Sequence, residues 1–97
     1  MEYLGIKIKQ EIECKNKLII LLEIADDQLL PKDSIANVIA VDLNKKILWR
    51  IEHPTTKHDF YEKIFFTGKE FYAFTGGGQL HHIDEETGKI ISSKMIK

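Results

Sequence analysis

The stretch FYAFTGGGQLHHIDEETGKII, Phe71–Ile91, carries the pattern that decides the fold. Two apolar runs of strand length, Phe71 to Thr75 and Leu80 to Asp84, are separated by three glycines, and a Thr-Gly-Lys turn then leads into a pair of isoleucines. Short runs of this kind, bounded by turn residues, are typical of antiparallel strands joined by hairpins. The glycines are therefore expected to turn the chain between strands.

The rest of the chain shows the same pattern, with a period of two in its apolar residues. Leu18 to Ala25 is a dense apolar run rich in β-branched residues, which indicates a central strand buried on both faces. Other segments of strand length are Gly5 to Lys9, Val38 to Leu43, Ile47 to Ile51, Ile64 to Thr67 and Ile90 to Met95. The short turns contain residues that accept a left-handed conformation, namely Asn16, Asn44, Gly68 and Gly88.

These signals predict an all-β fold, an antiparallel meander of about seven to nine strands with little or no helix. We expect Leu18–Ile24, Val38–Val41 and Ile47–Ile51 to be central in the sheet, and Trp49 to be mostly buried. A chain of 97 residues has room for one domain, residues 1–97. Within it, about residues 12–52 and 62–96 look like two copies of a four-stranded unit.

Composition excludes several classes of protein. Fourteen basic residues against 15 acidic ones give a formal charge of -1, without the basic excess of a nucleic-acid binder. The single cysteine, Cys14, can form neither an intramolecular disulfide nor a cysteine-based zinc cage, and it fits a reducing compartment. The longest apolar run, Leu18 to Leu22, stops at Glu23 and is too short to span a membrane. We therefore expect a cytoplasmic protein with neither a nucleic-acid nor a membrane partner.

The polar residues of the opening stretch do not form a chemical site. A phosphate loop needs glycines between a strand and a helix, whereas a strand follows Gly78. His81 and His82 are neighbours on a strand, so their side chains leave opposite faces and cannot grip one metal ion. Asp84 is expected to hold the backbone of its turn, with Glu85 and Glu86 solvated. No metal and no cofactor is predicted.

No arrangement of nucleophile and base stands out, because Ser34, Ser92 and Ser93 lack a Gly-x-Ser-x-Gly elbow and Cys14 has no neighbouring histidine. We predict no catalytic residues and no enzymatic activity. The aromatic residues between Phe60 and Phe74 alternate in direction, so both sheet faces receive rings. One face is expected to be core, and the other to be covered by a partner or by the N-terminal strands, although exposed rings could also stack sugars or bases.

Two segments, VIAVDLNKKILWRI and FYAFTGGGQLHHIDEETGKII, resemble the blades of pyrroloquinoline-quinone-type β-propellers, in which an Asp ends a strand and a turn leads into an apolar strand. The resemblance implies two blade-like units. A propeller needs several blades to close, so it implies no quinone site and no quinoprotein activity.

The whole chain is similar to a group of small blade-like bacterial proteins that are often immunity proteins of contact-dependent inhibition and related polymorphic toxin systems. The residues that carry the likeness are Asn37, Val38, Asp42, Asn44, Trp49, Ile51, Glu52, Pro54, Tyr61, Tyr72, Ala73, Thr75, Gly78, Asp84, Thr87, Gly88, Lys89 and Ile90. The resemblance implies that the protein neutralises a cognate antibacterial toxin by binding it. Nuclease immunity proteins are often strongly acidic, and this chain is nearly neutral, which leaves the type of toxin open.

The residues expected to contact the toxin lie in two polar loops, Asp26 to Ser34 and His53 to Glu62, and in the turn before Thr87. They are His53, His58, Asp59, Tyr61, Glu62, Asp26, Asp27, Glu85 and Glu86. Tyr61 and Asp59 are the expected anchors, and the alternative is that Tyr61 is core and Asp59 caps a turn. Two other functions remain open: a small ligand-binding module for carbohydrate, and a structural β module. Open edge strands also allow edge-strand pairing or a homodimer.

Overall fold

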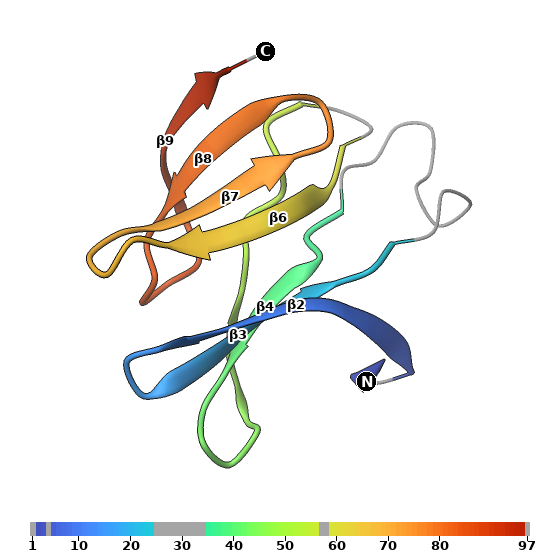
Figure 1. The fold of residues 1–97 in the computed structure, drawn as a ribbon, viewed down its shortest axis with the longest axis vertical. Coiled ribbons are helices and arrows are strands. Elements are labelled where there is room, and N and C mark those ends of the chain that lie inside the picture. The colour runs from blue at the N-terminus through green and yellow to red at the C-terminus, as the bar shows by residue number, and fades with distance from the viewer. Residues whose placement is uncertain (1, 4, 25–34, 57–58, 97) are drawn as a thin grey trace.

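The chain folds into antiparallel strands arranged in two sheets (Figure 1). The structure is a computed structural model, and it describes residues 2–3, 5–24, 35–56 and 59–96. The first sheet contains β1 (Glu2–Tyr3), β2 (Ile6–Cys14), β3 (Lys17–Leu22), β4 (Val38–Val41) and β5 (Ile47–Arg50) in that order. The second contains β6 (Tyr61–Phe66), β7 (Phe71–Thr75), β8 (Gln79–Ile83) and β9 (Ile90–Met95). The predicted all-β antiparallel fold is confirmed, with no helix among the described residues.

The second sheet begins close to the start of the predicted 62–96 unit, whereas the first sheet begins well before residue 12. Each sheet is a meander, because strands that follow one another along the chain are also neighbours in space. The relation of these sheets to propeller blades stays a prediction.

The central strands of the first sheet are buried on both faces, as the run from Leu18 predicts. Ile19 and Leu21 of β3 belong to one buried cluster, and Ile20 and Leu22 to another on the opposite face. The position predicted for Ile47–Ile51 was wrong, because β5 is the last strand of its sheet. Trp49 is the buried residue of β5, whereas Ile47, Leu48 and Arg50 are exposed, so this apolar run does not mark a central strand.

The main core lies between the two sheets. Along β7, Phe71, Ala73 and Thr75 are buried, while Tyr72 and Phe74 on the opposite face are half-buried. Trp49 of β5 is 7% exposed, as predicted, and its ring lies 6.3 Å from that of Phe71 in the second sheet. Side chains of this size contribute about 1.5–3 kcal/mol each when buried, so the contact between sheets is a main source of stability.

Two of the turn predictions were wrong by one residue. Lys15 (φ 55°) and Lys45 (φ 65°), not the adjacent asparagines, adopt the left-handed conformation. In the second of these turns, the Asp42 carboxylate accepts hydrogen bonds from the backbone N–H groups of Asn44 (2.8 Å) and Lys46 (2.9 Å). This places the left-handed residue between the two bonded amides. Gly68 and Gly88 have positive φ, as predicted.

Amide side chains from the first half of the chain close the outer edge of β6. Asn37 donates from Nδ2 to the carbonyl of Tyr61 (2.8 Å) and accepts from its N–H (2.9 Å). Gln10 makes the same pair of bonds with Ile64, at 2.6 Å and 2.9 Å. Each amide thus reproduces the bonds of a neighbouring strand, and we call this pair of side chains the amide clasp. The clasp joins the second sheet to the first.

Candidate functional site

The structure places both expected anchors of the toxin-binding site in the interior. Tyr61 is 1% exposed, and its hydroxyl donates to the carbonyl of Glu52 at 2.8 Å. Burial, with smaller effects from Glu52 and Asp59, raises the pKa of Tyr61. The expectation that Tyr61 anchors a partner is corrected, because a buried side chain offers no area to another protein.

Asp59 is also buried, and it organises the glycine turn that joins β7 to β8. Its carboxylate accepts hydrogen bonds from the backbone N–H groups of Phe60 (2.9 Å) and Gly77 (3.0 Å). A Cβ on Gly77 would lie 2.7 Å from the carboxylate oxygen, so glycine is required there by the close approach. Asp59 therefore caps a turn, which was the open alternative in the sequence.

Of the other expected residues, Glu62 lies beside Asp59 at the glycine turn, because carboxylate oxygens of Glu62 and Asp59 would be 3.3 Å and 3.5 Å from a Cβ on Gly76. His53, Glu62 and Glu86 are exposed. Asp26, Asp27 and His58 lie outside the described residues. Glu85, expected to be solvated, is instead largely covered.

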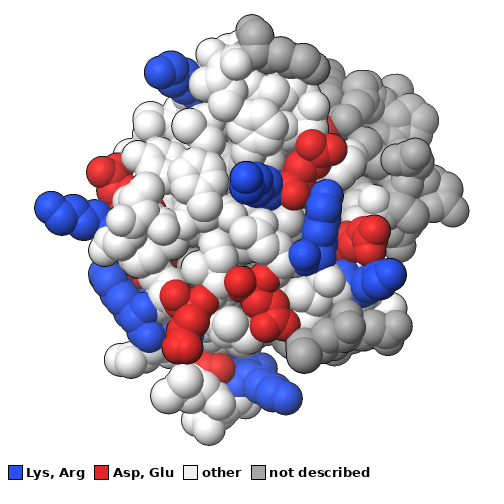
Figure 2. All heavy atoms as spheres, viewed as in Figure 1, with Lys and Arg blue, Asp and Glu red and all other residues white. Residues whose placement is uncertain are grey.

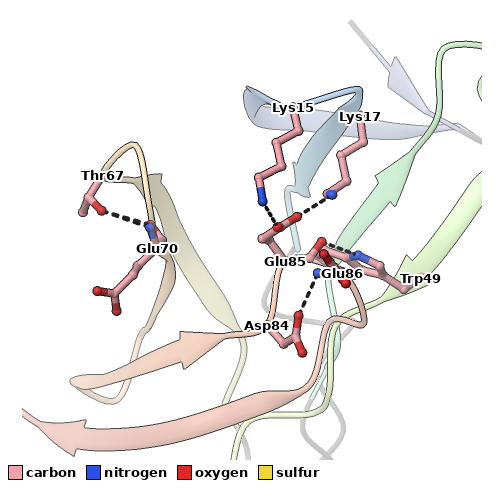
Figure 3. Close-up of polar contacts among 8 residues, drawn as sticks. All are labelled: Lys15, Lys17, Trp49, Thr67, Glu70, Asp84, Glu85 and Glu86. Atoms are coloured by element: carbon pink, nitrogen blue, oxygen red, sulfur yellow. Dashed lines mark hydrogen bonds and ion pairs between the residues drawn. The ribbon is translucent and has the colours of Figure 1, made fainter.

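Glu85 ties the turn between β8 and β9 to the turn between β2 and β3 (Figure 3). Its carboxylate contacts Lys15 Nζ at 2.6 Å and Lys17 Nζ at 2.5 Å, and its carbonyl accepts from the Trp49 indole N–H at 3.0 Å. The bonds to Lys15, then to Lys17, lower the pKa of Glu85. The Asp84 carboxylate accepts a hydrogen bond from the backbone N–H of Glu86 at 2.9 Å and so stabilises the same turn, as predicted.

Two open grooves flank the turn between β2 and β3. One, of about 450 Å³, is lined by Lys15, Asn16, Lys17, Leu48, Trp49 and Glu86. The other, of about 380 Å³, lies on the side of Leu43 and Lys45. Both contain lysines that already contact Glu85, so their charge is partly neutralised. We call Glu85, Lys15 and Lys17 the Glu85 cluster, and it links the turn of the second sheet to the first sheet beside the first groove.

The most distinctive surface lies on the outer face of the second sheet. Phe65, Tyr72 and His82 stand opposite one another on β6, β7 and β8. The ring of Tyr72 stacks on Phe65 at a centroid distance of 5.2 Å and on His82 at 5.0 Å. Phe74 and Leu80 form a second row beside them. We call these five half-buried side chains the ring face.

Charged groups lie at the margin of the ring face. Glu70 accepts a hydrogen bond from the Tyr72 hydroxyl at 3.0 Å and lies 3.1 Å from His82 Nε2. The bond to Glu70 raises the pKa of Tyr72. Lys63 and Lys94 flank the second row in the sheet register. In the view of Figure 2 the surface over the second sheet is largely uncharged, with acidic and basic residues around it.

The two histidines of β8 point to opposite faces, as predicted. His81 is fully buried, and its Nδ1 lies 2.5 Å from Ser93 Oγ. Burial lowers the pKa of His81, against the opposing charges of Asp59 and Glu52. Its environment is that of a core residue.

Among the described residues, no helix has the length and apolar character needed to cross a bilayer.

Comparison with known proteins places the chain in a family. A family model described as a domain of unknown function, DUF7957, matches residues 3–95. The chain belongs to this family. No curated protein and no solved structure matches it significantly.

Alternation predicted rings on both faces of the sheet but not which rings are neighbours, and the Glu85 cluster was missed in the sequence. Alternation along a strand shows which residues share a face with Tyr72 or with His82 on that strand. Only the register between the strands shows that these two rings are neighbours. Glu85 and Lys15 are 70 positions apart, and nothing in their local sequence indicates a contact. The alternation of β7 was the signal that predicted rings on this face.

Proposed function

We propose that this protein is a non-catalytic binding protein, and that its partner is a cognate antibacterial toxin, which it neutralises as an immunity protein. The proposal that the partner is a toxin rests on the resemblance of residues 37–90 to immunity proteins. The ring face carries the proposal of protein binding. A sheet face on which several large apolar and aromatic side chains gather and stay partly exposed is typical of a contact surface.

The stacking of the rings favours a protein over a carbohydrate. Phe65 and His82 lie on opposite sides of β7, so they cover both faces of the Tyr72 ring. A sugar ring stacks on an open aromatic face, which Tyr72 lacks. Upright rings present edges and the Tyr72 hydroxyl, which suit apolar side chains and backbone groups of another protein.

The test is co-expression with the product of the gene adjacent to this chain's own gene. We expect that product to stop growth when it is expressed alone and to be harmless together with this protein. Titration calorimetry on the two purified proteins should then give a stoichiometric complex. A neighbour that is not toxic, or that remains toxic in the presence of this protein, contradicts the immunity proposal.

The ring face is tested in the same system by Tyr72→Ala. Loss of an anchor of this kind weakens binding by more than about 1 kcal/mol, roughly a fivefold or greater loss of affinity. Leu43→Ala is the matched control, because Leu43 is 83% exposed and lies in the turn between β4 and β5 of the first sheet. Unchanged affinity for Tyr72→Ala with an unchanged melting temperature would place the contact elsewhere. Binding of oligosaccharides on a glycan array, if it is lost in Tyr72→Ala, would favour the carbohydrate-binding module.

A further inference from the structure

The hairpin between β4 and β5 leaves a continuous run of exposed residues, 43–48. Three of them are large and apolar: Leu43 is 83% exposed, Leu48 is 51% exposed and Ile47 is 49% exposed. Single apolar residues are normal on a protein surface, whereas several on one short element mark a contact surface. We call residues 43–48 the exposed hairpin.

The turn of the exposed hairpin has a fixed shape. The Asp42 N–H donates to the carbonyl of Lys46 at 2.9 Å, and the Lys45 N–H donates to the carbonyl of Asp42 at 3.0 Å. The Asp42 carboxylate accepts two further bonds, from the N–H groups of Asn44 and Lys46. The apolar side chains are therefore held outward by an ordered turn, and contact with a partner costs little further ordering of the backbone.

Positive charge lies beside these apolar residues. Lys45 and Lys46 are exposed, and neither makes an ion pair with another described residue. The acid of the same turn, Asp42, is occupied by backbone N–H groups. Glu13 and Glu86, which line the flanking grooves, belong to β2 and to the β8–β9 turn. The exposed hairpin itself thus combines apolar area with two unpaired cations.

The position of the exposed hairpin favours a lipid surface over a protein. Its turn lies at one end of the longest axis of the molecule, opposite the end that holds the C-terminus (Figure 1). A projecting tip can enter a soft surface, whereas a protein partner would have to supply a hollow of matching shape. Apolar side chains next to lysines are typical of segments that enter the interface of a bilayer and contact its anionic headgroups.

We propose that the exposed hairpin binds the surface of an anionic membrane, with Leu43 inserted among the headgroups and Lys45 and Lys46 on the lipid phosphates. The sequence predicted no membrane partner because no apolar run is long enough to span a bilayer, but contact with its surface needs no such run. This inference is independent of the proposed toxin partner, because the exposed hairpin belongs to the first sheet and the ring face to the second.

The experiment is flotation of the full chain with lipid vesicles at about 0.1 M salt. One set of vesicles contains phosphatidylcholine with about one third phosphatidylserine, and the other contains phosphatidylcholine alone. We expect the chain to float with the anionic vesicles and to bind the neutral ones at least tenfold more weakly. Lys45→Gln and Lys46→Gln together should weaken binding to the anionic vesicles by about tenfold or more, because each lysine near such a surface contributes roughly a fivefold gain.

Leu43→Ser tests the apolar part of the contact without a change of charge. We expect about a fivefold loss of binding to the anionic vesicles, since less apolar area enters the interface. Ile91→Ser is the matched control, because Ile91 is 58% exposed on the other sheet. The pair Lys63→Gln and Lys94→Gln is the control for charge. Both controls should bind as the wild-type chain does, and all of these variants should keep its melting temperature.

A fluorescent reporter locates the contact directly. The emission of Leu43→Trp should shift to shorter wavelength on addition of anionic vesicles, whereas that of Ile91→Trp should not, and the buried Trp49 adds the same background to both. The proposal is overturned if the chain does not float with anionic vesicles, floats equally with neutral ones, or floats unchanged after Leu43→Ser. It is also overturned if Leu43→Ser weakens binding to the adjacent gene's product while no flotation is seen, since the hairpin would then contact a protein.

Discussion

Tyr61 connects the core to the segment between the two sheets. Its ring lies edge-on to His81 at 5.8 Å, and its hydroxyl holds the Glu52 carbonyl. We expect Tyr61→Ala to lower the free energy of unfolding by about 3–5 kcal/mol, as for other large-to-small core changes. Tyr61→Phe keeps the ring and should cost about 1 kcal/mol through the lost hydrogen bond. Urea denaturation measures both, and a Tyr61→Ala loss below that of Tyr61→Phe would contradict this assignment.

His81 makes stability depend on pH. Its pKa in the folded chain is below the ordinary value of 6.5, because burial disfavours the charged ring. Below pH 6.5 the unfolded chain therefore takes up a proton that the folded chain does not, and the free energy of unfolding falls as the pH falls. This loss continues down to the lowered pKa of the folded state.

His81→Leu should remove this part of the pH dependence. Chemical denaturation of both proteins at about pH 7.5 and pH 5.5, on either side of the ordinary histidine pKa, measures the difference. The wild-type chain should lose more stability between these two conditions than the variant does. An equal loss of stability in both proteins would mean that the pKa of His81 does not differ between the folded and unfolded states.

Single residues divide into those that local chemistry predicts and those that it does not. Asp84 was predicted to hold its turn because Asp bonds to nearby amides whatever the tertiary fold. Tyr61 and Asp59 were given a surface role because a polar loop surrounds them in sequence. Their burial depends on Asn37 and on the segment around Glu52, which approach only in the folded chain.

At the scale of elements, Gly88 fixes how closely the β8–β9 turn packs against β5. A Cβ at this position would lie 2.5 Å from Trp49 Cε3, and the residue has φ +77°. Gly68 has φ +100° but nothing within 4 Å of such a Cβ, so it isolates the backbone effect. We expect Gly68→Ala to cost about 1–2 kcal/mol and Gly88→Ala distinctly more, with a shift in Trp49 fluorescence. Equal costs would show that the turn can move away from Trp49.

The amide clasp gives a second prediction at this scale. Gln10→Ala leaves the N–H and C=O of Ile64 without these bonds, and a cost of about 1–3 kcal/mol is expected for each group left unsatisfied in a buried setting. The amide of Ile64 should also exchange faster with solvent, while the amide of Ala73, inside the sheet, changes less. Asn37→Ala should cost more than Gln10→Ala, because Asn37 is fully buried and also donates to Leu22. The reverse order would contradict the role given to Asn37.

Strands were predicted well because each depends on its own alternation and on the turns beside it. β5 was misplaced because an apolar run does not show whether a strand pairs on both sides, and in the fold Ile47 and Leu48 of this edge strand are exposed. The division into two units was predicted from the internal repeat, whereas the clasp was not, because an amide side chain that bonds like a neighbouring strand leaves no periodic signal. The ring face follows from register, a property of pairs of strands.

For the whole molecule, the contacts between sheets predict a single unfolding transition. Trp49 of the first sheet packs on Phe71 and bonds to the carbonyl of Glu85 in the second half of the chain. Neither sheet can lose its structure while that contact remains. Unfolding followed by Trp49 fluorescence and by far-ultraviolet circular dichroism should therefore coincide. Two separated midpoints would show that the sheets unfold independently.

Cys14 gives this cooperativity a kinetic consequence. It is the only thiol in the chain, it is 1% exposed in the core between the sheets, and burial raises its pKa. A thiol reagent can reach it only in molecules that have opened. The rate of labelling under native conditions therefore measures the fraction of molecules in which Cys14 has become accessible. A stability of about 5 kcal/mol would slow labelling several thousandfold relative to the unfolded chain.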